Sequence, residues 1–356
     1  MKKYLLSIAA LLLGLLAHSQ EADDLGNYAE VSIIPRLDLN PTWSNSETGF
    51  NLGNSSLYTL FEGSASEHFS WTVANHWVSA SEWGAIGEET SALYKGLGYS
   101  DGNNLIDMMY VDLSFGSWTF NLGKNAIATG GHEYDDWDWL VHPVLASPLW
   151  NELACYQWGG KVSWSTPSEM TTFSLQMTTS PFGERPFGSG LWTWSAQWSG
   201  DYDWFKPLWS FSAFEQEAGE FGSAPKDYQF LVSLGNQFCF GDWTLTLDWS
   251  NTAGLAFDYS RFQKGWLLHG NLVYGLSDRL DLSLIGNYVS PAKTAAQYYD
   301  AFVYQTSWWS LGAVAEFYPL RDSRDLRLHA IAAYNDLFDQ FELSFGVLYN
   351  LNFRLW

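Results

Sequence analysis

The sequence predicts an all-β fold, a transmembrane outer-membrane antiparallel β-barrel of about 16 strands with short periplasmic turns and long extracellular loops. Three observations lead to it. The N-terminus has the layout of a secretory signal. Runs of about ten residues place apolar side chains at every second position, and tight turns alternate with long connections.

The first residues predict export across a membrane. Lys2 and Lys3 precede a largely apolar run over residues 4–16, and Ala17-His18-Ser19 follows it. About 13 apolar residues are too few for a membrane anchor, since a spanning helix needs about 20. We therefore expect residues 1–19 to be a cleaved signal peptide and residues 20–356 to form a single barrel domain in the outer membrane.

The composition excludes a helical membrane protein and suits a barrel. Beyond the signal, polar residues and glycines interrupt every apolar run before about 18 residues. The chain has 21 Trp, 19 Tyr and 23 Phe, which is dense for a soluble protein. Amphipathic rings gather at both surfaces of a bilayer and form girdles around barrels, so we expect outer-membrane lipid to surround this chain.

The net charge of the chain narrows the classes of molecule that it is expected to bind. There are 39 Asp and Glu against 17 Lys and Arg, a net charge of −22, so a nucleic acid is not an expected partner. The acidity fits either solvated loops or a pore mouth that attracts cations.

The two cysteines are not expected to form a disulfide. Cys155 falls at the loop end of one strand and Cys239 beside a turn at the opposite rim, so the two residues would lie too far apart.

The alternation is clearest in the C-terminal half. Between Asp242 and Ser250, Trp and Leu residues occupy one face and Asp and Thr residues the other. The strand after Arg279 repeats this pattern, with Ile285 as its one exception on the polar face. A soluble sandwich also alternates, but the asymmetry of short and long connections favours a barrel.

Sixteen strands are predicted from these patterns. Pro35 lacks an N–H group and fits an edge or a bulge better than a central strand, so 14 strands is the alternative. The even number places both termini on the short-turn side. The predicted strands are 28–40, 55–65, 68–79, 106–115, 117–125, 153–166, 169–179, 190–200, 203–214, 227–238, 240–250, 265–275, 278–290, 307–318, 323–334 and 341–356.

One stretch resembles a known family. Tyr110-Val111-Asp112-Leu113, Trp118-Thr119-Phe120-Asn121-Leu122-Gly123-Lys124-Asn125 and Gly130-Gly131-His132-Glu133 are similar to the outer-membrane porins of the phosphate-selective O and P type, over residues 106–164. The resemblance implies a 16-stranded barrel whose third long loop, here residues 126–152, folds inward and narrows the pore. Trimers are common among such porins, so a homotrimer is an expectation.

The predicted inward loop departs from that family. Anion-selective relatives place basic residues at the constriction, whereas this loop carries four acidic residues and no Lys or Arg. We expect a pore constriction at Glu133, Asp135, Asp136, Asp138, Trp137 and Trp139. A Ca²⁺ site and a sugar site are the alternatives, but the spacing matches no EF-hand loop, and no metal or other cofactor is expected.

A second group of charged residues is predicted to face the lumen. It comprises Asp112, Lys161, Asp281, Glu316, Asp325, Arg327 and His329. These side chains either set up a field across the pore or pair with one another along the wall, and the sequence leaves both readings open.

The predicted function is diffusion of small polar solutes through a porin-like channel that prefers cations or sugars to phosphate. The alternative is an accessory barrel that its own loops plug and that docks a partner protein in the membrane. No nucleophile elbow is present, and His132 and His142 are too far apart for a local pair of metal ligands. We therefore do not expect an enzyme.

Overall fold

The computed structural model describes residues 27–44, 48–52, 55–79, 106–183, 187–216, 226–255, 261–292 and 306–355. The predicted signal peptide, residues 1–19, lies outside the described residues. So do residues 80–105, which connect the strands predicted at 68–79 and 106–115.

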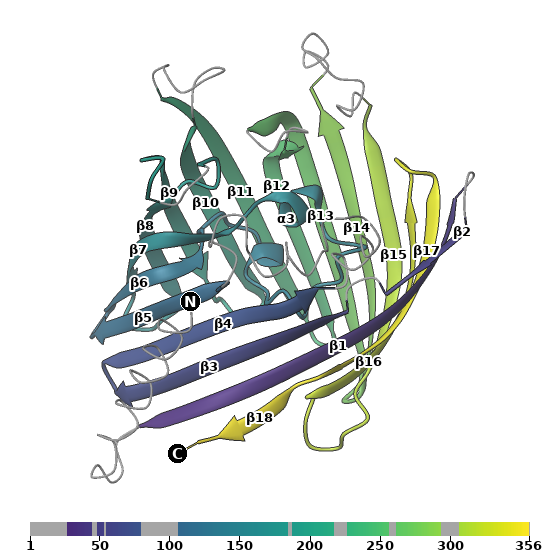
Figure 1. Cartoon of the computed structure of the whole chain (residues 1–356), viewed down its shortest axis with the longest axis horizontal. Helices are drawn as coiled ribbons and strands as arrows, with labels where there is room; N and C mark the ends of the chain where they lie inside the picture. The colour runs from purple at the N-terminus through teal and green to yellow at the C-terminus, as the bar shows by residue number, and fades with distance from the viewer. Residues whose placement is uncertain are drawn as a thin grey trace.

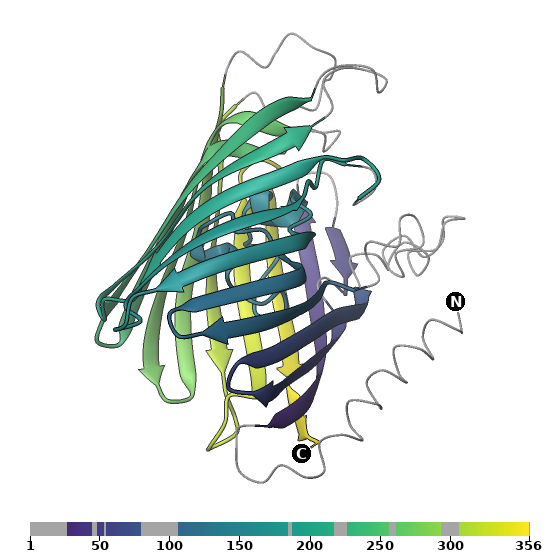
Figure 2. The same ribbon diagram turned by 90° about the vertical axis from the view of Figure 1, so that its left-hand side faces the viewer.

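The described strands form one antiparallel sheet that closes on itself (Figures 1 and 2). Closure comes from β1, which pairs with β3 on one side and with β17 and β18 on the other. The strand segments are β1 (Tyr28–Ser44), β2 (Thr48–Asn51), β3 (Ser56–Ser66), β4 (Phe69–Ser79), β5 (Met108–Phe115), β6 (Trp118–Ala126), β7 (Tyr156–Ser165), β8 (Thr171–Thr179), β9 (Trp192–Gly200), β10 (Phe205–Gln216), β11 (Asp227–Phe240), β12 (Trp243–Leu255), β13 (Phe262–Ser277), β14 (Leu280–Pro291), β15 (Trp308–Phe317), β16 (Leu326–Asn335), β17 (Gln340–Tyr349) and β18 (Leu351–Arg354).

The segments make a barrel of sixteen strands. β2 and β3 both pair with one edge of β1, and β17 and β18 both pair with its other edge. Segments β2 and β3 therefore count as one interrupted strand, and so do β17 and β18. The predicted sixteen strands are confirmed. Pro35 marks no sheet edge: β1 pairs with β18 as far as Ile33 and with β17 again from Arg36, so the residue without an N–H lies in the gap between the two pairings.

The connections show the predicted asymmetry. At the short-turn end, Phe115 lies opposite Trp118 with two residues between them, and Gly116 provides the positive φ of 57° that a tight hairpin needs. Between the strands predicted at 28–40 and 55–65, and again between those predicted at 240–250 and 265–275, the described residues of the connection are largely strand. There the hairpin pairing continues, with Thr42 opposite Gly49 and Thr252 opposite Lys264.

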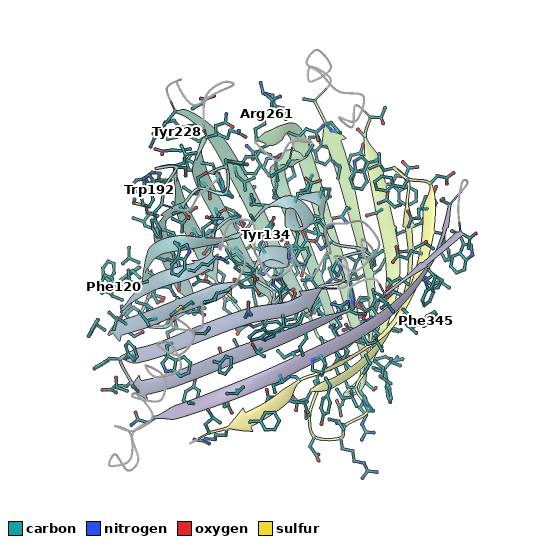
Figure 3. All side chains as sticks on the ribbon, in the orientation of Figure 1. Phe120, Tyr134, Trp192, Tyr228, Arg261 and Phe345 are labelled. Atoms are coloured by element: carbon teal, nitrogen blue, oxygen red, sulfur yellow. The ribbon has the colours of Figure 1, made fainter. Side chains whose placement is uncertain are left out.

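The wall is apolar outside and polar inside. Figure 3 shows Phe120 and Phe345 on the outer face and Tyr134 within the barrel. Leu175 is 64% exposed, whereas Gln176, the next residue of β8, is buried. A bilayer requires this pattern, because lipid covers the outer face and polar groups can be satisfied only inside.

Two further findings concern the described part of the chain. It contains no helix long and apolar enough to cross a membrane. Cys155 and Cys239 are both free, in agreement with the prediction that they form no disulfide.

Candidate functional site: the inner loop

Residues 127–155, which we call the inner loop, connect β6 to β7 and lie inside the barrel (Figures 1 and 2). The inner loop contains a short 3-10 helix, η2 (His132–Tyr134), and the helix α3 (Pro148–Glu152). Ser147 begins α3 by accepting a hydrogen bond from the backbone N–H of Trp150, and Pro148 takes the first helical position. The loop thus has an ordered structure of its own within the barrel.

The start of the inner loop is bonded to the wall. The side chain of Gln176 accepts from the N–H of Ala128 at 2.6 Å and donates to the carbonyl of Ala126 at 2.8 Å. Gly130 then approaches β10 so closely that a Cβ would lie 2.6 Å from Oγ of Ser210, and its φ is +70°. Only glycine suits this position, because any side chain would push the loop away from the strand.

Glu133 connects two parts of the inner loop and bonds the loop to the wall of the barrel. Its backbone N–H donates to Asp248 of β12 at 2.8 Å, and its carboxylate accepts from the N–H of Ser147 at 2.6 Å. His269 of β13 lies 3.4 Å from the same carboxylate. Burial raises the pKa of Glu133. We expected this side chain in the constriction, but it is buried between the loop and the wall, where it joins the two helical turns.

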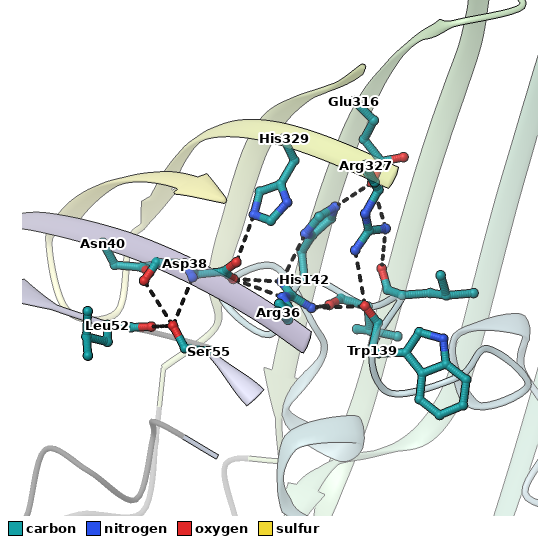
Figure 4. Close-up of polar contacts among 12 residues, drawn as sticks. Arg36, Asp38, Asn40, Leu52, Ser55, Trp139, His142, Glu316, Arg327 and His329 are labelled. Carbon is teal, nitrogen blue, oxygen red and sulfur yellow. Dashed lines mark hydrogen bonds and ion pairs between the residues drawn. The ribbon is translucent and has the colours of Figure 1, made fainter. Parts of the chain in front are cut away.

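Two arginines of the wall hold the middle of the inner loop (Figure 4). Arg36 of β1 donates to the carbonyls of Trp139 at 3.2 Å and Val141 at 2.6 Å. Arg327 of β16 donates to the carbonyls of Trp139 at 3.1 Å and Leu140 at 3.2 Å. Guanidinium groups suit this task because they present several donors in a fixed plane. We call the pair the arginine clamp.

The charges of the arginine clamp are balanced by buried carboxylates. Arg36 pairs with Asp38 at 2.9 Å, and Arg327 pairs with Glu316 of β15 at 2.9 Å. His329 of β16 lies 3.3 Å from Asp38. Each ion pair is almost fully enclosed, so removal of one partner would leave a buried charge without compensation.

His142 links the two halves of the arginine clamp. Arg36 can only donate, so the Nδ1 atom of His142, 3.5 Å away, accepts, and its Nε2–H donates to Glu316 at 3.0 Å. Burial lowers the pKa of His142 to about 4, although the bond to Glu316 acts in the opposite direction. His142 is therefore neutral at physiological pH and relays a hydrogen bond from β1 to β15.

Apolar packing fixes the inner loop at three places. Leu149 and Leu153 pack against β10 to β15, Trp139 packs against β1 and its neighbours, and Leu145 packs against β14 to β16. Ile285, the exception to the alternation of its strand, lies in the cluster around Leu145. An apolar residue on the lumen face is explained by the loop that covers it.

The other expected constriction residues divide into two groups. Asp135 and Asp136 are exposed inside the barrel, whereas Asp138 accepts a hydrogen bond from Tyr156 at 2.7 Å. Trp137 stacks on Trp139 with ring centres 4.6 Å apart, and Trp139 is buried. Only part of the predicted set is therefore placed to meet a passing solute.

The surroundings of the loop carboxylates shift their pKa values. Asp136 is exposed at its surface, but the loop and the wall around it exclude much of the water, and this desolvation raises the pKa of Asp136 to about 6, with a further contribution from the charge of Asp135. Burial likewise raises the pKa of Asp138 to about 6, and the bond from Tyr156 opposes this shift. Both groups gain a proton at a pH well above the usual range of a carboxyl group.

A cavity of about 220 Å³ lies between the inner loop and the wall. The loop contributes residues 127–131 and 134–137, and β5, β6, β7, β9 and β10 contribute the opposite side. Asp135, Asp136 and Trp137 border it from the loop, and Lys161 borders it from β7.

The predicted lumen residues mostly pair along the wall. Glu316 pairs with Arg327, Asp281 pairs with Arg324 at 2.7 Å, and Asp112 accepts from Asn121 at 2.9 Å. Asp325 bonds to Ser323, and Asn352 donates to it at 3.3 Å; His329 lies beside Asp38. Lys161 differs from them because it borders the cavity. Of the two readings left open above, pairing along the wall describes this group better than a field across the pore.

The sequence reasoning missed Arg36 and Asp38. Both belong to the first strand, where Arg36, Asp38 and Asn40 alternate with apolar residues. This alternation indicates that Arg36 and Asp38 face the lumen, but Pro35 argued against a regular central strand there. Among the described residues, no group of three or more His, Cys, Asp or Glu side chains is placed to hold a metal ion.

Comparison with known proteins supports the fold. No protein-family model matches the sequence, and no curated protein matches it. Among solved structures, OmpF of Salmonella typhi in complex with daunomycin is 11% identical, with a TM-score of 0.62, over 92% of this chain and 98% of that one. A triple mutant of the Rhodopseudomonas blastica porin is 11% identical, with a TM-score of 0.55, over 90% of this chain and 100% of that one.

A third structure is OmpT of Vibrio cholerae in a trimer form, described as an outer membrane protein. It is 9% identical, with a TM-score of 0.54, over 91% of this chain and 99% of that one. At these identities the likeness shows the fold, and the finer resemblance to the phosphate-selective O and P type stays a prediction. The closed sixteen-stranded barrel, apolar outside and crossed by a loop within, is the fold of the outer-membrane porins.

Proposed function

We propose that the chain is an outer-membrane channel for small polar solutes and that Asp135 and Asp136 give it a preference for cations. The observation that carries this proposal is which charged side chains inside the barrel are paired and which are not. Arg36 and Arg327 are committed to loop carbonyls and to buried carboxylates. Asp135 and Asp136 are exposed, and among the described residues their carboxylates have no partner.

The first prediction concerns ion selectivity. Replacing Asp135 and Asp136 by Asn should lower the cation-to-anion permeability ratio about two- to fivefold at low salt. Each charge lost changes the energy of a cation about 8 Å away by about 0.5 kcal/mol in water, and salt screens the effect. The measurement is the reversal potential of the mature chain in a planar bilayer under a salt gradient.

Asp203→Asn is the matched control. Asp203 is an exposed acid in the short turn between β9 and β10, where its φ of 63° suits Asn. It lies outside the inner loop, so the ratio should stay at the wild-type value. An equal fall in both variants would contradict the assignment to the loop. Absence of any conductance from a folded barrel would overturn the channel and favour the plugged accessory barrel.

The second prediction concerns pH. Because the pKa of Asp136 is raised to about 6, its negative charge is present at pH 7 and largely lost at pH 5. Cation preference should therefore weaken as the pH falls through 6, whereas an ordinary Asp would keep its charge until about pH 4. The measurement is the reversal potential at several pH values between about 7.5 and 4.5, a range that brackets the expected midpoint.

Asp136→Asn should remove the step near pH 6 and leave any change at lower pH in place. A wild-type ratio that is constant from about pH 7 to 5 would contradict the raised pKa as the source of selectivity.

We also infer that the channel assembles as a homotrimer. Support comes from the trimer form of the structurally similar OmpT and from the apolar outer wall, which is available to lipid and to neighbouring subunits. Light scattering of the detergent-solubilised protein should give three chains per particle, and a monomer at all concentrations would contradict the inference.

A further inference from the structure

The cavity beside the inner loop has the lining of a binding site. Aromatic rings come from both of its sides, Trp137 and Tyr134 from the loop and Tyr110 and Tyr156 from the wall. Its volume of about 220 Å³ is below the range of about 300–1,000 Å³ typical of sites for drug-sized ligands. A ligand that fills it is therefore small.

The rings are held in place before any ligand arrives. Trp137 stacks on Trp139 at an interplanar angle of 16°, which covers one face of its indole, and the half-buried ring borders the cavity. The hydroxyl of Tyr156 donates to Asp138, and that of Tyr134 donates to the carbonyl of Leu149. Preorganised rings lose little entropy on binding, which favours affinity for a flat apolar surface.

Polar groups of both kinds border the same cavity. Asp135 and Asp136 offer acceptors, Lys161 offers donors and Gln197 of β9 offers both. Within the described part of the chain, none of these four side chains has a hydrogen-bond or ion-pair partner. They lie on the loop and on two different strands, so a bound molecule would meet polar groups from more than one side.

This combination selects a class of ligand. An anion is disfavoured because two carboxylates outnumber one ammonium. A purely apolar molecule would leave the four polar side chains unpaired. A monosaccharide satisfies both requirements, because its hydroxyl groups donate and accept while the C–H face of its ring stacks on an indole.

We propose that the cavity is a binding site for a neutral monosaccharide, with Trp137 as the stacking surface and Asp135, Asp136, Lys161 and Gln197 as hydroxyl partners. The proposal deepens the proposed function, since it names a substrate class for the channel and rests on that function for its role in transport. The binding itself is a property of the folded barrel.

The test is calorimetric titration of the refolded, detergent-solubilised chain with D-glucose. Trp137→Leu should weaken binding by about two- to twelvefold, because an aromatic contact is worth about 0.5–1.5 kcal/mol. Gln197→Ala, which removes an unpaired side chain from a strand, should weaken it about threefold without changing the fold. Trp194→Leu is the control, since Trp194 is 50% exposed on the outer face and should leave binding unchanged.

The outcomes separate this site from the channel. Saturable glucose binding that both cavity variants weaken would support the site, even if bilayers containing the protein stayed silent. No saturable binding to a barrel that conducts ions would overturn the site alone. Glucose binding that Trp137→Leu and Gln197→Ala leave unchanged would overturn the site as well. So would binding of choline, a small cation, without binding of glucose.

Discussion

Arg36→Ala should destabilise the barrel by about 3–5 kcal/mol and loosen the inner loop. The substitution leaves Asp38, whose side chain is fully enclosed, without its guanidinium partner, and removal of one member of a buried pair costs about that much. It also removes the donors to the carbonyls of Trp139 and Val141. The measurements are the free energy of unfolding in urea and the single-channel conductance, which should become larger and noisier.

Arg324→Ala is the matched control for the arginine clamp. Arg324 also pairs with a carboxylate, Asp281, at 2.7 Å, but its side chain is 55% exposed. The carboxylate of Asp281 is only 10% exposed, but water reaches the pair on the side of the guanidinium, so the loss of stability should be clearly smaller than for Arg36→Ala and the conductance should change little. Equal losses in the two variants would contradict the special role of Arg36. A loss of stability with unchanged conductance would show that the apolar clusters alone hold the loop.

The double variant Arg36→Met with Asp38→Leu separates the two effects of Arg36. It removes the buried charges together, so much of the lost stability should return. The carbonyl of Val141 would still lack its donor and that of Trp139 would keep only Arg327, so the conductance should remain noisy.

Gly346→Ala should also destabilise the arginine clamp, by about 1–3 kcal/mol or more. A Cβ on Gly346 of β17 would lie 2.2 Å from Oδ1 of Asp38 and 2.4 Å from Cε1 of His329. Both side chains are enclosed and have no free space to move into. The expected result is a lower urea midpoint of unfolding, with loosening of the loop segment around His142.

Gly270→Ala serves as the control for added volume. At Gly270 of β13 the nearest atom to a new Cβ is Cδ2 of Leu247 at 3.5 Å, an ordinary contact. Its midpoint should stay close to that of the wild type. If both glycine variants were equally stable, the close packing around Asp38 would not contribute to the stability of the barrel.

Most of the wall could be predicted from local sequence. Lipid requires an apolar outer face and permits a polar inner face, so residues such as Trp243, Leu245 and Leu247 alternate with Thr244 and Thr246. Tight turns such as the one at Gly116 then divide the chain into strands. These signals act over two to ten residues, which is why the predicted strands agree with the observed ones within a few positions.

The site could be predicted only in part. The acidic composition of the inner loop is visible in the sequence, but which carboxylate is buried and which is exposed is not. Glu133 bonds to Ser147 within the loop, and its N–H donates to Asp248, 115 residues away. An acidic side chain therefore has a structural role at 133, as Glu, and an exposed position at 135, as Asp.

By itself, the sequence determined the period of the strands and their outward face, because a bilayer imposes both on short segments, and it predicted sixteen strands with fourteen as the alternative. Only the tertiary structure decided how the interior is used. Arg36 donates to the carbonyl of Trp139, 103 residues away, and Ile285 of β14 packs in one cluster with Leu145 of the inner loop. Such contacts depend on closure of the barrel around the inner loop, which no local pattern of residues encodes.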